Sequence, residues 1–168
     1  MAKRRRYGKF DDKKLGMLRT GKEAAIIALA AIIVLLFVLG ISKVSGNSME
    51  PTLHDGQPVI FARLHGTYKA GDVVSLRMAN DEYLVKRVVA VAGDTIEIRS
   101  GKLYVNGIAE SVNYGVTNRA ESSTVKYPLT LKEGQIFVLG DNREVSVDSR
   151  TFGPIASSQT RGLVLFVK

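Results

Sequence analysis

An uncharged run of 18 residues, Ala24–Ile41, constrains the fold of this chain more than any other feature. As a helix it would span about 27 Å, close to the roughly 30 Å hydrocarbon core of a bilayer. A cleaved secretory signal has a shorter apolar region of about 7–15 residues and then a small-x-small site, and no good site follows here. No polar face interrupts the run, so a buried soluble helix is also disfavoured. We therefore predict a retained transmembrane anchor.

Charge is concentrated before this run and predicts its orientation. Residues 1–22 contain nine Lys or Arg and two Asp, whereas the residues from Ser42 onward contain 15 basic and 13 acidic side chains. Positive charge beside an apolar segment stays on the cytoplasmic side of a membrane. A nucleic-acid-binding tail is the less common meaning of such a segment. We expect the N-terminus inside, the C-terminal domain outside and no nucleic-acid partner.

Three parts are predicted along the chain: a basic cytoplasmic tail (1–23), the anchor (24–41) and an extracytoplasmic domain (42–168) large enough for a core of its own. The chain has no Cys, which excludes disulfides, thiolate nucleophiles and Cys-ligated metals. Its two His residues, His54 and His65, lie in polar, loop-like segments. We expect neither a metal site nor a catalytic His.

The domain after the anchor has the pattern of a mostly β fold. Short apolar runs alternate with Gly-Asp turns, and Asn106-Gly107 is a strong hairpin signal. Outside the anchor no helical periodicity of useful length is present. The polar stretch Glu110–Thr124 predicts a mobile loop or a poorly defined lobe. The predicted strands are Gln57–Ala62, Val73–Met78, Tyr83–Ala92, Thr95–Arg99, Lys102–Val105, Gln135–Leu139 and Gly162–Val167.

Ser48 is the first candidate for chemistry. It lies seven residues after Ile41, and seven extended residues reach about 23–25 Å, so we expect it at or near the membrane surface. The segment Val44–Leu53 is rich in Gly, Asn, Ser and Pro and predicts a tight, irregular turn. Such a turn can present a hydroxyl and a backbone N–H to one point, as acyl transfer requires. The alternative, which stays open, is that Ser48 only stabilises the turn and has no catalytic role.

Lys86 is the better candidate than either His for the base that a serine needs. Strand alternation places Leu84, Lys86 and Val88 on one face, where Lys86 is the only charge. An exposed lysine, with a pKa of about 10.4, is protonated at neutral pH, but desolvation can lower the pKa to about 7–8. A lysine that snorkels from a strand edge is the alternative. Arg87 points the other way and should need an acidic partner.

A third segment, Gly140–Arg150, follows an apolar strand and combines carboxylates, guanidinium groups and hydroxyls. It is either a solvated loop with local ion pairs or a source of hydrogen bonds that orient the lysine. The three segments together resemble the type I signal peptidase family, and the resemblance extends over nearly the whole chain from Ala24. Ser48–Leu53 resembles its serine box, Gly71–Val74 its conserved-domain strand, Lys86–Asp94 its lysine box, and Gly140–Arg143 with Ser146 and Asp148–Arg150 its last box.

The resemblance implies an antiparallel-sheet catalytic domain that removes signal peptides from exported preproteins. Cleavage would follow small-x-small sites at the outer surface of the bacterial cytoplasmic membrane. Ser48 would be the nucleophile and Lys86 the general base, with no metal or other cofactor. The Ser48 backbone N–H would stabilise the oxyanion, and Ser146 would orient the Lys86 amine. The substrate would bind as an added strand.

Further residues receive supporting roles from the same resemblance. Asp141 would pair with Arg87, and Asp148 with Arg150, so that the strands carrying the dyad are held in place. Met49, Pro51 and Leu53 would face the substrate or the membrane.

One position departs from part of the family. Some members place a Ser two residues before the nucleophile as a second oxyanion donor, and here that position is Gly46. Loss of one such donor can cost on the order of 100-fold in rate. The Gly version resembles the smaller, single-anchor members of Gram-positive bacteria. The accessory lobe, about 95–134, should also be reduced.

Other functions stay open at this point. The chain could be dedicated to a pilin or another surface protein, or be a non-catalytic relative that assembles pili. Relatives of the latter kind tend to lack the Ser and the Lys, and both are present here. A self-cleaving repressor would carry a DNA-binding helical domain in place of the anchor. A pure binding module would leave Lys86 unexplained.

Overall fold

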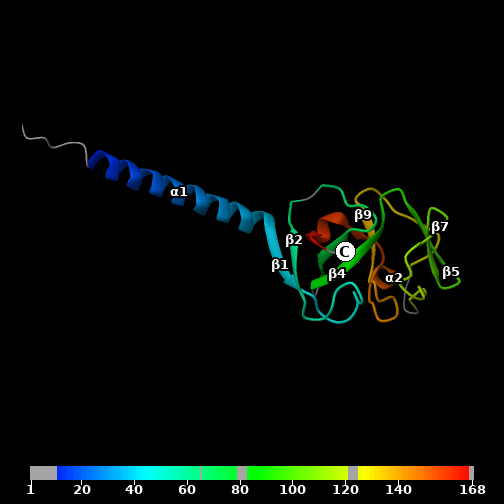
Figure 1. The fold of residues 1–168 in the computed structure, drawn as a ribbon. Coiled ribbons are helices and arrows are strands. Elements are labelled where there is room, and N and C mark those ends of the chain that lie inside the picture. The colour runs from blue at the N-terminus through cyan, green and yellow to red at the C-terminus, as the bar shows by residue number, and fades with distance from the viewer. Residues whose placement is uncertain (1–10, 65, 79–82, 121–124, 167–168) are drawn as a thin grey trace, which may run out of the picture. The chain divides into compact units, whose positions relative to one another are not determined.

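The computed structural model describes residues 11–64, 66–78, 83–120 and 125–166. The chain divides into two compact units, Met1–Val38 and Leu39–Lys168 (Figure 1). The first ten residues of the predicted basic tail, together with His65, lie outside the described residues.

A single helix, α1 (Asp11–Val38), makes up the described part of the first unit. Its stretch Thr20–Val38 has 19 residues and a mean hydropathy of 2.3, long and apolar enough to cross a membrane. Large apolar side chains are exposed along it, as Leu36 and Phe37 are. A soluble helix would bury such side chains against protein, whereas lipid is an adequate solvent for them.

The end of the helix differs from the prediction. α1 ends at Val38, and the next five residues form strand β1 (Leu39–Lys43), which pairs antiparallel with β2 (Pro58–Ala62). The helix therefore ends three residues before the predicted end of the anchor at Ile41. At Gly40 the two strands pack so closely that a Cβ there would lie 2.2 Å from the Phe61 ring. Only glycine permits this close approach between β1 and β2.

The second unit is mostly antiparallel β, as predicted. Over the described residues it has a seven-stranded sheet in the order β1-β2-β11-β3-β4-β9-β10 and a four-stranded sheet in the order β7-β6-β5-β8. Figure 1 shows β5 and β7 of the small sheet apart from β4 and β9 of the large one. The remaining elements are β3 (Val73–Arg77), β4 (Tyr83–Val91), β5 (Thr95–Arg99), β6 (Lys102–Val105), β7 (Ile108–Ala109), β8 (Leu129–Thr130), β9 (Gln135–Leu139), α2 (Ser149–Phe152), β10 (Ile155–Ala156), a 3-10 turn (Ser157–Gln159) and β11 (Thr160–Val164).

Strand β4 is central to the large sheet and has one partly open edge. It pairs with β3 over Tyr83–Arg87, but with β9 only over Arg87–Val91, where the register shifts between Val88 and Ala90. Among the described residues, the β9-side edge of Tyr83–Lys86 therefore has no strand partner. Backbone groups on such an edge are available to an added strand.

Candidate active site

Ser48 lies in the turn between β1 and β2. The turn is closed by backbone hydrogen bonds from Leu53 to the Met49 carbonyl (2.9 Å) and from Glu50 to the Asn47 carbonyl (3.2 Å). Gly46 adopts a φ of +75°, a conformation that costs little only for glycine. Its N–H donates to Asp55 Oδ1 at 2.8 Å. Gly46 thus shapes the turn, and a side chain at this position would strain it.

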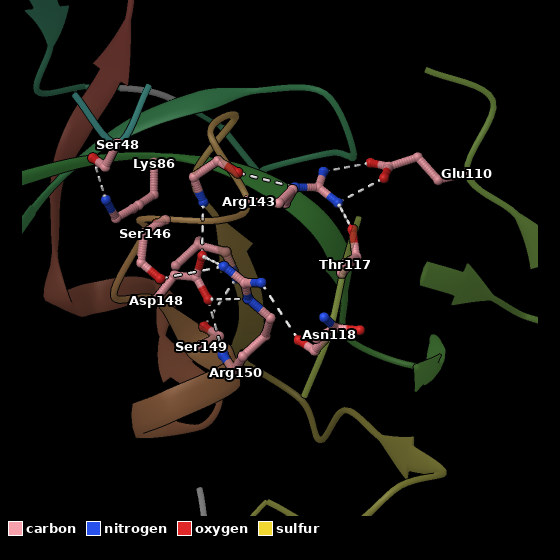
Figure 2. A network of polar contacts seen from close by, with 12 residues as sticks. Ser48, Lys86, Glu110, Thr117, Asn118, Arg143, Ser146, Asp148, Ser149 and Arg150 are labelled. Carbon is pink, nitrogen blue, oxygen red and sulfur yellow. Dashed lines mark hydrogen bonds and ion pairs between the residues drawn. The ribbon is translucent and has the colours of Figure 1, made fainter. Parts of the chain in front are cut away.

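The structure brings Ser48 and Lys86 together from two separate elements. Lys86 lies near the middle of β4, and its Nζ donates a hydrogen bond to Ser48 Oγ at 2.6 Å. Figure 2 shows the two side chains pointing toward each other. A hydroxyl within hydrogen-bond reach of an amine is the geometry of an activated nucleophile and its base.

Burial changes the acid–base chemistry of Lys86. The residue is only 2% exposed, and desolvation lowers its pKa from 10.5 to about 8. The carboxylates of Asp148 and Asp141 raise the pKa and so oppose this shift, whereas the Arg150 guanidinium lowers the pKa further. The amine is therefore neutral in a useful fraction of molecules near neutral pH, as a general base must be.

The pH profile of the reaction is expected to follow this pKa. Only the neutral amine accepts a proton, so kcat/KM should rise with pH and level off above about 8. At pH 7 about a tenth of the Lys86 side chains should be neutral. Measuring kcat/KM between about pH 6 and about pH 10 on one substrate tests this. A profile that is flat or falling between pH 6 and pH 8 would contradict it.

The loop after β9 supports the backbone of the serine turn. The Asn142 N–H donates to the Ser48 carbonyl at 3.1 Å. Gly140 lies so close that a Cβ would meet the same carbonyl oxygen at 2.4 Å and Ser146 Oγ at 2.2 Å. This close packing requires glycine and fixes where the Ser48 peptide lies relative to the loop.

Two buried ion pairs, both implied by the family resemblance, hold this loop in place. Arg87 binds Asp141 through two hydrogen bonds of 2.8 and 2.7 Å, and Thr52 of the serine turn donates to the same carboxylate at 2.5 Å. The bond to Asp141 raises the pKa of Arg87. Arg150 binds Asp148 through Nε and one terminal nitrogen, at 2.8 and 2.9 Å. Asp141 thus joins the serine turn, β4 and the β9 loop.

Asp148 has further partners besides Arg150. It accepts from the Gly140 N–H at 3.0 Å and from the Arg150 N–H, and it caps α2. The neighbouring Ser149 Oγ accepts from the Val138 N–H of β9 at 3.0 Å. These contacts hold the residues after the loop against β9 and its end. The position of Gly140 therefore depends on them.

The expected contact between Ser146 and Lys86 is absent. Ser146 Oγ is buried and has no hydrogen-bond partner among the described residues, so the prediction that it hydrogen-bonds the amine is contradicted. Its side chain packs against Gly140, and its carbonyl accepts from Arg150 at 3.2 Å. The local packing against Gly140 therefore fixes Ser146 beside the dyad without a bond to it.

Two of the three residues expected to face the substrate or the membrane are in the core. Met49 is 0% and Leu53 is 4% exposed, in one cluster with Val44 and Val85. The expectation that they face the membrane is wrong, because the turn directs both side chains inward to fill the space behind Ser48. Pro51 is exposed. Contact of any of the three with substrate stays a prediction.

One cluster was missed by sequence reasoning. Arg143 donates to both carboxylate oxygens of Glu110 (2.7 and 2.8 Å), to Thr117 Oγ1 (2.8 Å) and to the Gly140 carbonyl (2.9 Å). Its guanidinium also lies over the Tyr114 ring at 4.7 Å. Glu110, Tyr114 and Thr117 all belong to the stretch predicted to be mobile or poorly defined, of which 121–124 lie outside the described residues. These three residues lie in a loop without helix or strand, and all three contact Arg143, because a buried charge needs partners.

No group of three or more metal-ligating side chains is present among the residues that the structure describes. His54 is exposed, lies 3.7 Å from Glu50 and takes no part in the Ser48–Lys86 pair.

Comparisons with known proteins show which family the chain is similar to. The family model described as signal peptidase, peptidase S26, matches residues 17–168. Signal peptidase I of Bacillus licheniformis is 35% identical over 173 residues, covering 95% of this chain and 92% of that protein. Signal peptidase IB of Staphylococcus aureus (strain N315) is 37% identical over 165 residues, covering 84% and 86%. A crystal structure of a signal peptidase I from Enterococcus faecalis V583 is 29% identical, with a TM-score of 0.48, covering 58% of this chain and 97% of that one.

Proposed function

The chain belongs to the signal peptidase family, peptidase S26, and on that premise we propose that Ser48 is its nucleophile and Lys86 its general base. The protein is a serine peptidase of the signal peptidase I type, and its substrates are preproteins. One observation carries the assignment of the dyad: a buried amine of lowered pKa, 2.6 Å from a turn serine.

Each step of the proposed reaction moves a proton through Lys86. The neutral amine takes the Ser48 hydroxyl proton while Oγ attacks the scissile carbonyl carbon, and the Ser48 N–H stabilises the oxyanion that forms. The resulting ammonium gives its proton to the leaving nitrogen, the C–N bond breaks, and an acyl-Ser48 ester remains. Lys86 then takes a proton from water, which attacks the ester and releases the signal peptide. The serine regains its proton from Lys86.

The open edge of β4 supports binding of the substrate as an added strand. An extended segment before the cleavage site can pair with Tyr83–Lys86 and so bring its last carbonyl to Ser48. Next to this position the space is filled by Met49 and Leu53 with Val44 and Val85. Small side chains at the first and third positions before the cut fit such a packed site, and we propose that the substrate contacts Pro51, which is exposed, while Met49 and Leu53 fill the core beneath it.

Cleavage of a preprotein with a defined site tests this function. The full chain in detergent should cut a preprotein that has Ala at the first and third positions before the cleavage site. Mass spectrometry should place the new N-terminus directly after the Ala at the first of these positions. The matched substrate with Leu at the position before the cut should be cleaved at least about 10-fold more slowly, since an extra side chain of that size does not fit a small pocket. Equal cleavage of both substrates would contradict the proposed site.

A narrower role is the second candidate. Dedication to a pilin or another surface protein would leave the same dyad in place, and a non-catalytic assembly role would leave the Ser48–Lys86 pair without a purpose. Cleavage of a general preprotein favours the housekeeping function, whereas cleavage of one surface protein alone favours dedication.

We further propose a single pass through the cytoplasmic membrane, with a basic cytoplasmic tail (1–23), the helix as anchor and an extracytoplasmic catalytic domain. The nine Lys or Arg of residues 1–22 support this orientation. The chain has no Cys, so single cysteines can report it. In intact cells stripped of their wall, Ser158→Cys should react with a membrane-impermeant maleimide, and Ala2→Cys only after lysis. The reverse pattern would contradict the orientation, and the Cys-free chain is the control.

A further inference from the structure

A polar cavity of about 510 Å³ opens beside the catalytic pair, on the side of Ser146. Residues lining it include Val116, Asn118, Arg119, Arg143, Ser146 and Arg150. Ser146 connects the cavity to the dyad, because both Ser146 Oγ and the Ser48 carbonyl lie within 2.4 Å of the position that a Cβ on Gly140 would take. The volume is in the range of ligand-binding pockets.

Two buried arginine residues lie along one side of this cavity. Arg143 is 2% and Arg150 5% exposed, and ion pairs with Glu110 and Asp148 fix their orientation. Figure 2 shows both directed toward the segment that carries Thr117 and Asn118. Arg150 reaches the Asn118 carbonyl at 3.4 Å and so connects the two sides of the cavity. The arginine side of the cavity is therefore rigid before any ligand arrives.

Hydrogen-bonding groups at the cavity are left without partners. An arginine has five N–H groups, and four are engaged in Arg143 (with Glu110, Thr117 and Gly140) and four in Arg150. One N–H of each is thus unpaired within the part of the chain that the structure describes. Ser146 Oγ is buried and also unpaired among these residues. Of these three, only the Arg150 side chain keeps some exposure (6%), so its free N–H is the donor available to a carbonyl group of a ligand in the cavity.

The path of the substrate identifies that ligand. If the signal-peptide side pairs with Tyr83–Lys86, the chain beyond the scissile bond cannot continue along β4, because β9 occupies that edge from Arg87 onward. It must leave over the Gly140–Asp148 loop, where Ser146 and the cavity lie. The peptide carbonyls of the chain that follows the cleavage site would then lie beside the cavity and within reach of Arg150.

We propose that this cavity binds the first residues of the mature protein, through the backbone of the preprotein directly after the cleavage site. The inference rests on the proposed peptidase function. Binding there would hold the leaving group in line with the Lys86 ammonium while the C–N bond breaks. Remote contacts of this kind raise the rate of the chemical step as well as affinity.

Two substrates with the same signal-peptide segment test the proposal. One continues into several mature residues, and the other ends in a fluorogenic aryl amide directly after the cleavage site. Val116→Trp should fill the cavity without disturbing the core, because Val116 is 51% exposed. We expect it to lower kcat/KM for the long substrate about 10-fold or more and to change aryl-amide cleavage by less than about twofold. The change should include kcat, because leaving-group placement is affected.

Matched variants and outcomes keep this test decisive. Val112→Trp is the control, since Val112 is similarly exposed (54%) on the same lobe but does not line this cavity. Ala120→Phe fills the cavity from another position and replaces Val116→Trp if that variant does not fold. An equal loss on both substrates, or no loss on either with both filling variants, would overturn the proposal. If the unaltered protein cleaves neither substrate, the proposed function fails and this inference with it.

Discussion

Replacing Lys86 with Met is expected to abolish cleavage and at the same time to stabilise the fold. Loss of a general base costs roughly 10²–10⁴-fold in rate, and more where nucleophile and base act as a unit. Lowering the pKa of Lys86 from 10.5 to about 8 means that its buried charge costs about 3 kcal/mol at neutral pH. Met fills a similar volume without charge. Loss of the hydrogen bond to Ser48 Oγ offsets about 1 kcal/mol of the stability gained. A net gain of about 2 kcal/mol in the free energy of unfolding is expected.

The pH dependence of this gain provides an internal check. The folded pKa of Lys86 lies below the unfolded value, so the unfolded chain binds more protons between about pH 8 and about pH 10.5. The free energy of unfolding of the unaltered protein should rise with pH in that window, and the advantage of Lys86→Met should shrink. Urea unfolding at pH 7 and about pH 10 measures both effects. Lys102→Met, at an exposed position, is the control and should change little. A destabilised or active Lys86→Met variant would contradict the account.

Asp148→Ala should have the largest effect on stability. The carboxylate is 0% exposed and accepts hydrogen bonds from Arg150 Nε, a second Arg150 nitrogen and the Gly140 N–H. Its removal leaves the guanidinium of Arg150 buried without a counter-charge. We expect this to lower the free energy of unfolding by about 3–5 kcal/mol. The loop after β9 that supports the Ser48 carbonyl loses the ion pair that holds it in place. Cleavage should therefore fall even where the chain still folds.

Denaturant unfolding, together with cleavage measured under folding conditions, separates the two effects of Asp148→Ala. Glu133→Ala removes an exposed carboxylate close to β9 and should change the free energy of unfolding by less than about 0.5 kcal/mol. A similarly small effect of Asp148→Ala would show that the ion pair does not hold the loop.

The strands and the dyad were accessible from the sequence because local signals agree with the fold. Turn residues bounded β5 and β6 correctly, and alternation in β4 marked Lys86 as a charge in an apolar context. β1 was missed because hydropathy alone does not distinguish the last residues of an anchor from an edge strand, and the Gly40–Phe61 contact is long-range. β8 and β10 have two residues each and α2 has four, too short for any periodicity.

Partners of buried charges were less predictable. Asp141 and Asp148 were paired correctly only through the family resemblance, since spacing along the chain does not say which carboxylate meets which guanidinium. Arg143 lay within a segment already marked for ion pairs, but Glu110 is 33 residues away in a stretch whose polarity indicates a loop. For Ser146 the family resemblance itself was misleading. The hydrogen bond to Lys86 that it implied is absent, and the Ser146 side chain packs against Gly140 instead.

Cleavage of a preprotein by the unaltered chain, beside Ser48→Ala and the control Ser45→Ala, tests the central claim most directly. Ser45 is exposed in the same turn, three residues before the proposed nucleophile. The account predicts that the unaltered chain and Ser45→Ala release the mature protein with the same new N-terminus. Ser48→Ala should give no product above the background, while its unfolding curve stays close to that of the unaltered protein. Cleavage by Ser48→Ala at an undiminished rate would contradict the assignment of Ser48 as nucleophile and, with it, the proposed mechanism.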